Sequence, residues 1–338
     1  MSLKRKIMYI NVRLQLSVPV IILLMSSLSA FSQKDSLSFW EYPDTLHKAR
    51  FWTAAGVGVV AYTGTLLTLN NLWYDQYERT TFHLFNDAKE WQQMDKAGHV
   101  FTAYFESEWC YQVARWTGME RGPSIWAGAL VAVGLQTTIE VLDGFSSEWG
   151  FSMYDFTANL AGAGMWAAEQ AIWDDQRIKL KMSTTFVTYP EDVVLGVPGG
   201  STTIRERTDD LYGTNLFQTF LKDYNAQTIW MSFNIHSFLK EESRFPKWLN
   251  VAVGYGAQNM YGGFENEWMI DENTFTLDPA IYPRYRQWYL SPDIDLSRLK
   301  VRSKFLKTLL CMANIFKFPA PALVINGKGG VQWDWLHY

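Results

Sequence analysis

The sequence predicts an α+β protein with a membrane-associated bundle of about four helices, followed by an antiparallel β-rich half that is a small sheet or partial barrel. Long apolar stretches rich in Gly and Ala fill the chain up to about residue 180. Beyond it, short runs of alternating apolar and polar residues are separated by Gly, Pro and Asn. The 338 residues are 48% hydrophobic and 16% aromatic, which excludes a disordered chain.

The first 32 residues predict a secretory signal peptide. Basic residues precede an apolar run from Val18 to Met25, and Ser29-Ala30-Phe31-Ser32 forms an Ala-x-Ser cleavage site before Gln33. The run is too short to span a bilayer, and no cysteine stands at the cleavage site, so we expect no lipoprotein anchor. We therefore expect an exported protein of the cell envelope, in the periplasm or at the outer membrane, with a helical domain at 33–180 and a β-rich domain at 181–338.

The first predicted helix, Phe51 to Tyr74, contains no charged residue and is long enough to cross a bilayer. Aromatic pairs at its two ends, Phe51-Trp52 and Trp73-Tyr74, are typical of a membrane–water interface. Three glycines and four threonines lower its hydrophobicity. The stretch is therefore either a membrane helix or a buried central helix of a soluble bundle.

Three further helices are predicted at about Asp95 to Trp116, Ser124 to Leu142, and Ser152 to Trp173. The first of them carries charged side chains, so it cannot simply face lipid. In the last, Ala158-x-x-x-Gly162 places two small residues on one face, where they allow helix backbones to approach closely.

Polar side chains of these three helices are expected to meet. Asp95 and His99 are four residues apart on one helical face, where a carboxylate can orient an imidazole. Ionisable groups among apolar helices are costly unless they are paired. We therefore predict one cluster, which contains Asp95, Lys96, His99, Glu140, Asp155 and Asn159.

These residues also have structural interpretations. Ser152-Met-Tyr-Asp155 matches a capping box, Asp95 can serve as a helix N-cap, and His99 can be a core histidine bonded to a carboxylate. A structural cluster is therefore weighed against a substrate or lipid-headgroup site and against acid–base catalysis. A metal bound by His99, Glu140 and Asp155 would have one nitrogen and two oxygen ligands, although this spacing is not diagnostic.

Other chemistries lack support in the sequence. The HExxH, GxSxG, GxxxxGK[ST] and CxxC patterns are absent, so we expect no cofactor. Cys110 and Cys311 are the only cysteines, and we expect both to be buried free thiols. The net charge of -4 argues against a nucleic-acid partner.

Two family resemblances rest on these motifs. Asp95-Lys96-x-x-His99, Glu140 and Ser152-x-x-Asp155-x-x-x-Asn159-x-x-Gly162 resemble the signature of VanZ-like membrane proteins over about residues 94–165. Most of the mature chain resembles the YfiM-like envelope proteins, a family of unknown function described as periplasmic or lipoprotein members; the segments 223–230, 248–256 and 285–291 contribute to this likeness. The chain lacks the lipoprotein cysteine, and the Gln and Arg that often follow the VanZ-like Glu are not in register. Neither resemblance implies a reaction.

The β-rich half shows period-two alternation at Thr228–Leu239 and Leu249–Tyr255. Further strands are expected at Thr184–Tyr189, Arg286–Leu290, Asp293–Leu296, Ala322–Ile325 and Val331–Trp335. Most are shorter than the roughly nine residues that a membrane strand needs. A small sheet or partial barrel packed on the helices is therefore expected.

Residues 297–318 contain six basic residues and no acidic one. Apolar residues recur there at roughly helical spacing, which predicts an amphipathic helix with its apolar side at a membrane interface and its basic groups on anionic headgroups. A helix packed on the sheet with a solvated basic face is the alternative.

Two functional hypotheses follow. The first is a non-enzymatic envelope protein that binds membrane lipid or a partner protein of the envelope. The alternative is a membrane-bound hydrolase or transferase acting on a lipid or envelope glycan, with His99 as general base and Asp95 or Asp155 orienting it. The sequence contains no feature that defines an oligomeric state.

Overall fold

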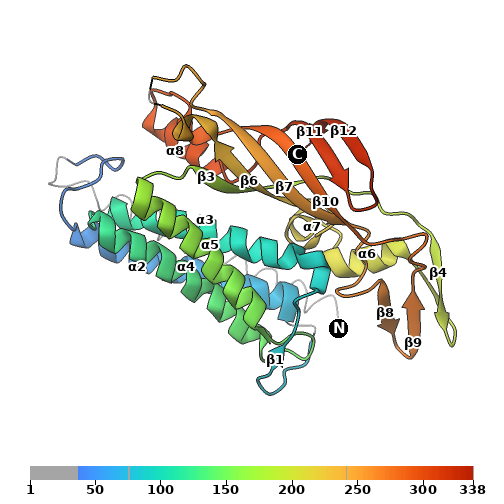
Figure 1. Cartoon of the computed structure of the whole chain (residues 1–338). Coiled ribbons are helices and arrows are strands. Elements are labelled where there is room, and N and C mark those ends of the chain that lie inside the picture. Colours follow the sequence, from blue (N-terminus) through green and yellow to red (C-terminus); the bar gives the residue numbers. More distant parts are fainter. Residues whose placement is uncertain (1–36, 75–76, 241, 338) are drawn as a thin grey trace. The chain divides into compact units, whose positions relative to one another are not determined.

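The structure of the protein is a computed structural model, which describes residues 37–74, 77–240 and 242–337. The predicted signal peptide lies outside these residues. From Tyr42 onward the chain forms one compact unit, in which helices precede a strand-rich half (Figure 1). The predicted α+β fold class is confirmed.

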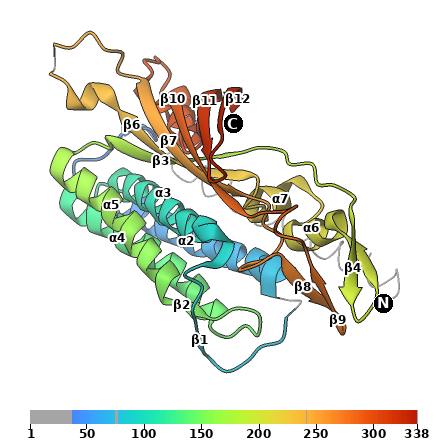
Figure 2. The ribbon, with the colours of Figure 1, turned by 45° about the vertical axis from the view of Figure 1, so that its right-hand side comes forward.

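Four long helices make up the first half. They are α2 (Lys48–Leu69), α3 (Met94–Trp116), α4 (Arg121–Asp143) and α5 (Met153–Trp173), and α2 continues into a π-helical turn at Asn70–Tyr74. Helices α3, α4 and α5 pack on one another, and α2 lies beside them (Figures 1 and 2). A 3-10 turn at Glu90–Gln93 precedes α3, and a short parallel pair joins β1 (Leu84–Phe85) to β2 (Phe151–Ser152).

The helix starts follow local capping chemistry. Ser152 caps α5, because its hydroxyl accepts hydrogen bonds from the backbone N–H groups of Tyr154 and Asp155. Helix α4 begins at Arg121, three residues before the predicted start, because Pro123 is tolerated in a first turn. The N-cap of α3 is Gln93, so the interpretation of Asp95 as an N-cap is wrong.

Small residues set the spacing of the helices. A Cβ added at Gly162 of α5 would lie 2.1 Å from the carbonyl oxygen of Val100 in α3. A Cβ at Gly128 of α4 would lie 2.6 Å from the carbonyl oxygen of Ser107. The close helix approach expected at Gly162 is therefore present.

The second half is built on a six-stranded antiparallel sheet in the order β12-β11-β10-β7-β6-β3. Its strands are β3 (Ile178–Thr184), β6 (Gln227–Asn234), β7 (Leu249–Gln258), β10 (Tyr285–Ile294), β11 (Ala320–Asn326) and β12 (Val331–His337). The sheet curls into a half-barrel, since the ring of His337 on β12 lies 5.7 Å from the ring of Trp230 on β6. On its other face, Leu180, Met182 and Ile229 share a hydrophobic core with residues of α3. Figure 2 shows α3 beside β3.

Three strand predictions need correction. The strand at Thr184–Tyr189 is wrong, because β3 ends at Thr184 and begins at Ile178. The strands Arg286–Leu290 and Asp293–Leu296 are one strand, β10, which tolerates Pro292 because pairing with β11 stops at Leu290. The strand from Thr228 ends at Asn234, whose side chain caps a 3-10 turn at Ile235–Phe238.

Several short elements were missed. A four-stranded sheet has the order β5-β4-β9-β8 and contains β4 (Val193–Val197), β5 (Ser201–Thr203), β8 (Glu267–Ile270) and β9 (Asn273–Thr276). Helices α6 (Ile204–Tyr212) and α7 (Leu216–Lys222) lie between β5 and β6 along the chain. The strands among these elements have only three to five residues, which is too short for a clear alternation of apolar and polar residues.

The basic segment forms a shorter helix than predicted, because α8 spans only Lys304–Ala313 after a 3-10 turn at Leu296–Arg298. Three of its basic residues have partners inside the protein: Arg298 pairs with Asp175 and Asp295, Lys307 donates to backbone carbonyls, and Lys317 lies over the ring of Trp230. A fully solvated basic face is therefore wrong.

Both cysteines are free thiols, as expected. Their predicted burial is wrong, since Cys110 is half-buried and Cys311 on α8 is exposed.

Candidate functional site

The six predicted polar residues lie together at one end of the bundle, where α3 and α5 begin and α4 ends. Asp95 and Asp155 lie in the first turns of their helices, and Glu140 lies in the last turn of α4. His99 and Asn159 follow Asp95 and Asp155 by four residues each, so they lie about one helical turn further along α3 and α5. The sequence thus brings polar groups from three helices to a single place.

Lys96 is the cation of the cluster. Its ammonium nitrogen lies 3.1 Å from Asp95 Oδ2 and 3.0 Å from Asp155 Oδ1. A third carboxylate, Asp87 Oδ2, lies at 2.5 Å. Asp87 is buried and also accepts a hydrogen bond of 2.6 Å from the hydroxyl of Ser152.

Asp87 and Tyr224 belong to this site but were not predicted from the residues. Asp87 lies in a loop before α3, where no helical spacing marks it. Tyr224 lies between α7 and β6, and its hydroxyl donates a 2.7 Å hydrogen bond to Asp95 Oδ1. Segment 223–230 was noted only for its family resemblance, so no chemical signal pointed to Tyr224.

His99 is held by a hydrogen bond between its Nδ1 atom and Asn159 Oδ1, at 3.1 Å. Because an amide oxygen only accepts, Nδ1 carries the proton in this arrangement. Its Nε2 atom then faces Asp95 Oδ1 and Glu140 Oε1, each at 3.7 Å, and Asp155 Oδ1 at 4.0 Å. These three separations exceed hydrogen-bond length.

Burial and charge set the protonation of the cluster. Burial and the neighbouring Asp95 carboxylate raise the pKa of Asp155 to about 10. Burial also acts to raise the pKa of Asp95, but His99 and Lys96 outweigh it and hold that pKa below its ordinary value. Burial acts to lower the pKa of Lys96, yet Asp95 and Asp155 raise it overall. Lys96 therefore remains charged, whereas Asp155 holds a proton at neutral pH.

Within the cluster, two buried carboxylate oxygens, Glu140 Oε1 and Asp155 Oδ1, have no hydrogen-bond partner among the described residues, and neither does the side-chain amide nitrogen of Asn159. The other Glu140 oxygen accepts a 3.3 Å hydrogen bond from the backbone N–H of Ser152. Asp95, His99 and Asp155 each offer one ligand atom, and these atoms lie within 4.8 Å of one another. This group has Asp95 in the place of the predicted Glu140, whose Oε1 atom lies 3.7 Å from His99 Nε2.

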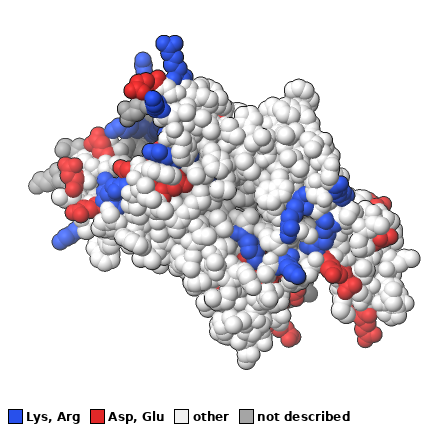
Figure 3. Space-filling view, in the orientation of Figure 1, with Lys and Arg blue, Asp and Glu red and all other residues white. Residues whose placement is uncertain are grey.

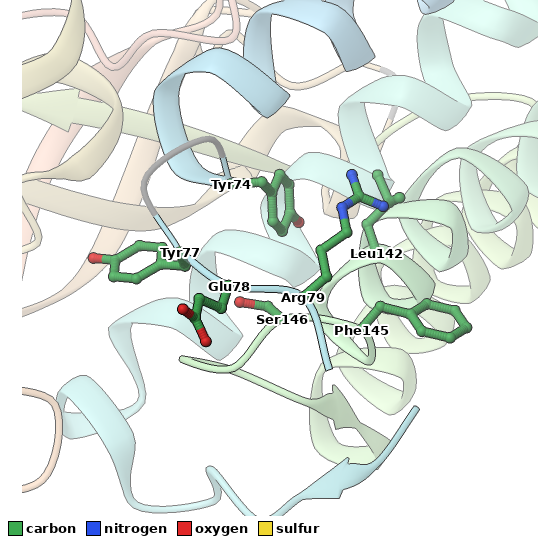
Figure 4. A pocket seen from close by; sticks show the side chains of 7 residues that line it. All are labelled: Tyr74, Tyr77, Glu78, Arg79, Leu142, Phe145 and Ser146. Carbon is green, nitrogen blue, oxygen red and sulfur yellow. The ribbon is translucent and has the colours of Figure 1, made fainter. Parts of the chain in front are cut away.

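None of the cluster residues lines either of two pockets in the described part of the chain. One is a crevice of about 10 Å³, lined by residues such as Tyr74, Arg79 and Phe145 (Figure 4), which leaves room for about one water molecule. The other, of about 310 Å³, is lined by residues such as Tyr189, Asn225 and Tyr282 of the β-rich half. His99 lines neither of them.

Residues 84–169 match the model of a family described as a predicted periplasmic lipoprotein, DUF2279. The match covers about a quarter of the chain, from β1 to α5, and includes all six predicted cluster residues. No curated protein and no solved structure matches the chain significantly.

This match identifies an uncharacterised envelope-protein domain. The protein is exported and associated with the cell envelope, as expected from the predicted signal peptide. Its activity is unknown.

Proposed function

We propose that the protein is an integral membrane protein of the envelope, which contacts lipid through α2, α4 and the adjoining apolar surface. The observation that carries this proposal is the exposure of α2. Its 22 residues are apolar enough to cross a membrane, and none of those in its apolar window is buried. A helix of this length extends about 33 Å, close to the roughly 30 Å of a hydrocarbon core. The alternative of a buried central helix does not fit this exposure.

Helix α4 supports the same conclusion, since it too is long and apolar enough to cross a membrane. One side packs against α3 and α5, while Trp126, Leu130 and Val131 are exposed on the other. Large contiguous apolar surfaces are rare on proteins that face only water. Figure 3 shows a broad uncharged area between charged side chains that gather towards two sides of this face.

The sheet extends the apolar surface. The face that packs on α3 through β3 and β6 continues uncovered across β7, β10 and β11, where Val253, Leu290 and Ile325 are exposed. On α8, Phe305, Leu309 and Met312 are exposed too. Lipid is the occupant that fits these surfaces, because helices and sheet share an uncharged exterior while the half-barrel interior holds buried ions such as Lys181.

The catalytic alternative has weaker support. His99 has carboxylates near its Nε2 atom and is 17% exposed, but neither described pocket offers a substrate space beside it. A general base needs its substrate proton within hydrogen-bond reach. The polar cluster is therefore not proposed as a catalytic centre.

Alkaline carbonate extraction of membranes that contain the mature protein tests this proposal. We expect the protein to stay in the pellet and to dissolve only in detergent. Val59→Lys should weaken insertion, because a charge inside a spanning helix costs about 3 kcal/mol. Ile281→Lys is the matched control: Ile281 is 68% exposed, like Val59 at 67%, but lies in a loop before β10. Complete release of the unaltered protein by carbonate would refute the proposal.

A further inference from the structure

The polar cluster contains more acidic side chains than basic ones. Four carboxylates, those of Asp87, Asp95, Glu140 and Asp155, surround one ammonium and one imidazole. Lys96 contacts three of the carboxylates, and the basic group nearest to Glu140 is the His99 imidazole, at 3.7 Å. Buried carboxylates are costly unless they are paired or bind a cation.

The two carboxylate oxygens of the cluster that lack a hydrogen bond both lie near His99 Nε2. Glu140 Oε1 has no hydrogen-bond partner although the Glu140 side chain is only 1% exposed, and it lies 3.7 Å from His99 Nε2. Asp155 Oδ1, on a side chain that is 7% exposed, makes no hydrogen bond of good geometry either, although it forms a 3.0 Å ion pair with Lys96. Fully satisfied buried groups are the rule in folded proteins, so two such oxygens beside one imidazole nitrogen require an explanation.

The orientation of His99 strengthens this argument. Asn159 accepts the Nδ1 proton and thereby directs the Nε2 lone pair towards the carboxylate oxygens. This is the outer-shell arrangement that fixes the tautomer of metal-binding histidines. A lone pair facing carboxylate oxygens is repulsive unless a proton or a metal cation lies between them.

The spacing fits a metal ion. Zinc bonds to His nitrogen and carboxylate oxygen are about 2.0–2.2 Å long, so neighbouring ligands in a tetrahedral shell are roughly 3.3–3.6 Å apart. The separations of 3.7, 3.7 and 4.0 Å from Nε2 are slightly longer. Mixed imidazole and carboxylate ligands suit divalent first-row transition metals.

We propose that Asp95, His99, Glu140 and Asp155 form a binding site for one divalent transition-metal cation, such as Zn²⁺ or Mn²⁺. Asn159 positions the imidazole, and Lys96 neutralises the remaining carboxylate charge from the other side. This inference goes beyond membrane insertion and does not depend on it.

Titration of the mature protein in detergent, after EDTA treatment, with Zn²⁺ and with Mn²⁺ tests the site. We expect one cation per chain, with Zn²⁺ bound more tightly than Mn²⁺. His99→Ala and the nearly isosteric Glu140→Gln should each weaken binding at least tenfold. Glu106→Gln is the matched control, because it makes the same substitution at a carboxylate outside the cluster. Glu106 is a partly buried residue of α3 that pairs with Gln136.

A Co²⁺ absorption spectrum of the unaltered protein provides a readout that needs no variant. Visible bands from coordinated Co²⁺ that disappear on addition of Zn²⁺ are expected. Absence of bound cation in the folded unaltered protein would overturn the proposal, as would unchanged affinity in the folded His99→Ala and Glu140→Gln variants. Carbonate extraction reports separately on membrane insertion.

Discussion

Replacement of Gly162 by alanine is expected to separate α3 from α5. The added Cβ would lie 2.1 Å from the Val100 carbonyl oxygen and 2.9 Å from the Val100 carbonyl carbon. Both atoms belong to the backbone, so no side chain can rotate to make room. The clash therefore acts on the helix interface that brings His99 to Asn159.

The cost can be compared within the same helix. Overpacking a close-packed interior costs about 1–3 kcal/mol, and a rigid backbone contact belongs at the upper end. Gly164 is the matched control, because a Cβ there meets nothing within 4 Å. Both substitutions gain up to about 1 kcal/mol of helix propensity, so the clash alone separates them by about 3 kcal/mol.

Thermal unfolding of the mature protein in detergent, followed by tryptophan fluorescence, measures this difference. Gly162→Ala should melt roughly 6 °C below Gly164→Ala, at about 2 °C per kcal/mol for a chain of this size. Equal melting temperatures for the two variants would refute the close approach of α3 and α5.

Three further predictions concern the sheet half and the cysteines. Burial acts to raise the pKa of Asp295, but neighbouring lysine charges outweigh it and lower this pKa to about 2. The ionised Asp295 carboxylate therefore contributes about 2 kcal/mol to folding stability above pH 4, and this contribution is lost between about pH 4 and 2. Asp295→Asn should flatten this part of a stability–pH profile. Lys181→Met leaves the Asp293 carboxylate, 2.7 Å away in a fully buried pair, without its ammonium; denaturant unfolding should show a loss of about 3–5 kcal/mol, and no loss would contradict the pairing. Maleimide should modify the exposed Cys311 faster than the half-buried Cys110 in detergent, and equal rates would contradict these exposures.

The helices could be predicted because their apolar stretches are long and their ends carry recognisable signals. Within them, helical spacing was sufficient to put Asp95 beside His99 and Asp155 beside Asn159. Asp87 could not be found in this way, because its place beside Lys96 depends on a loop rather than on periodicity. Contacts of this kind are defined only by the folded chain.

The strand β3 was missed for an electrostatic reason. Lys179 and Lys181 alternate with apolar residues, and two lysines so close in sequence suggest a solvent-exposed segment. In the structure they pair with Asp295 and Asp293, at 3.1 and 2.7 Å. The partners lie more than a hundred residues away, so the sequence gives no local sign that these lysines can be buried.

The position of the polar cluster along the bundle connects the two proposals. Glu140 lies three residues before the end of α4, which corresponds to about 4.5 Å along the helix axis. The cluster is thus close to the end of a candidate membrane span, where a cation can arrive from water without crossing a hydrocarbon core of about 30 Å. At mid-membrane the same carboxylates would be far more costly. Since the apolar exterior of α2 and α4 and the polar end of the bundle involve different side chains, Glu140→Gln should abolish cation binding while leaving the protein in the carbonate-washed membrane.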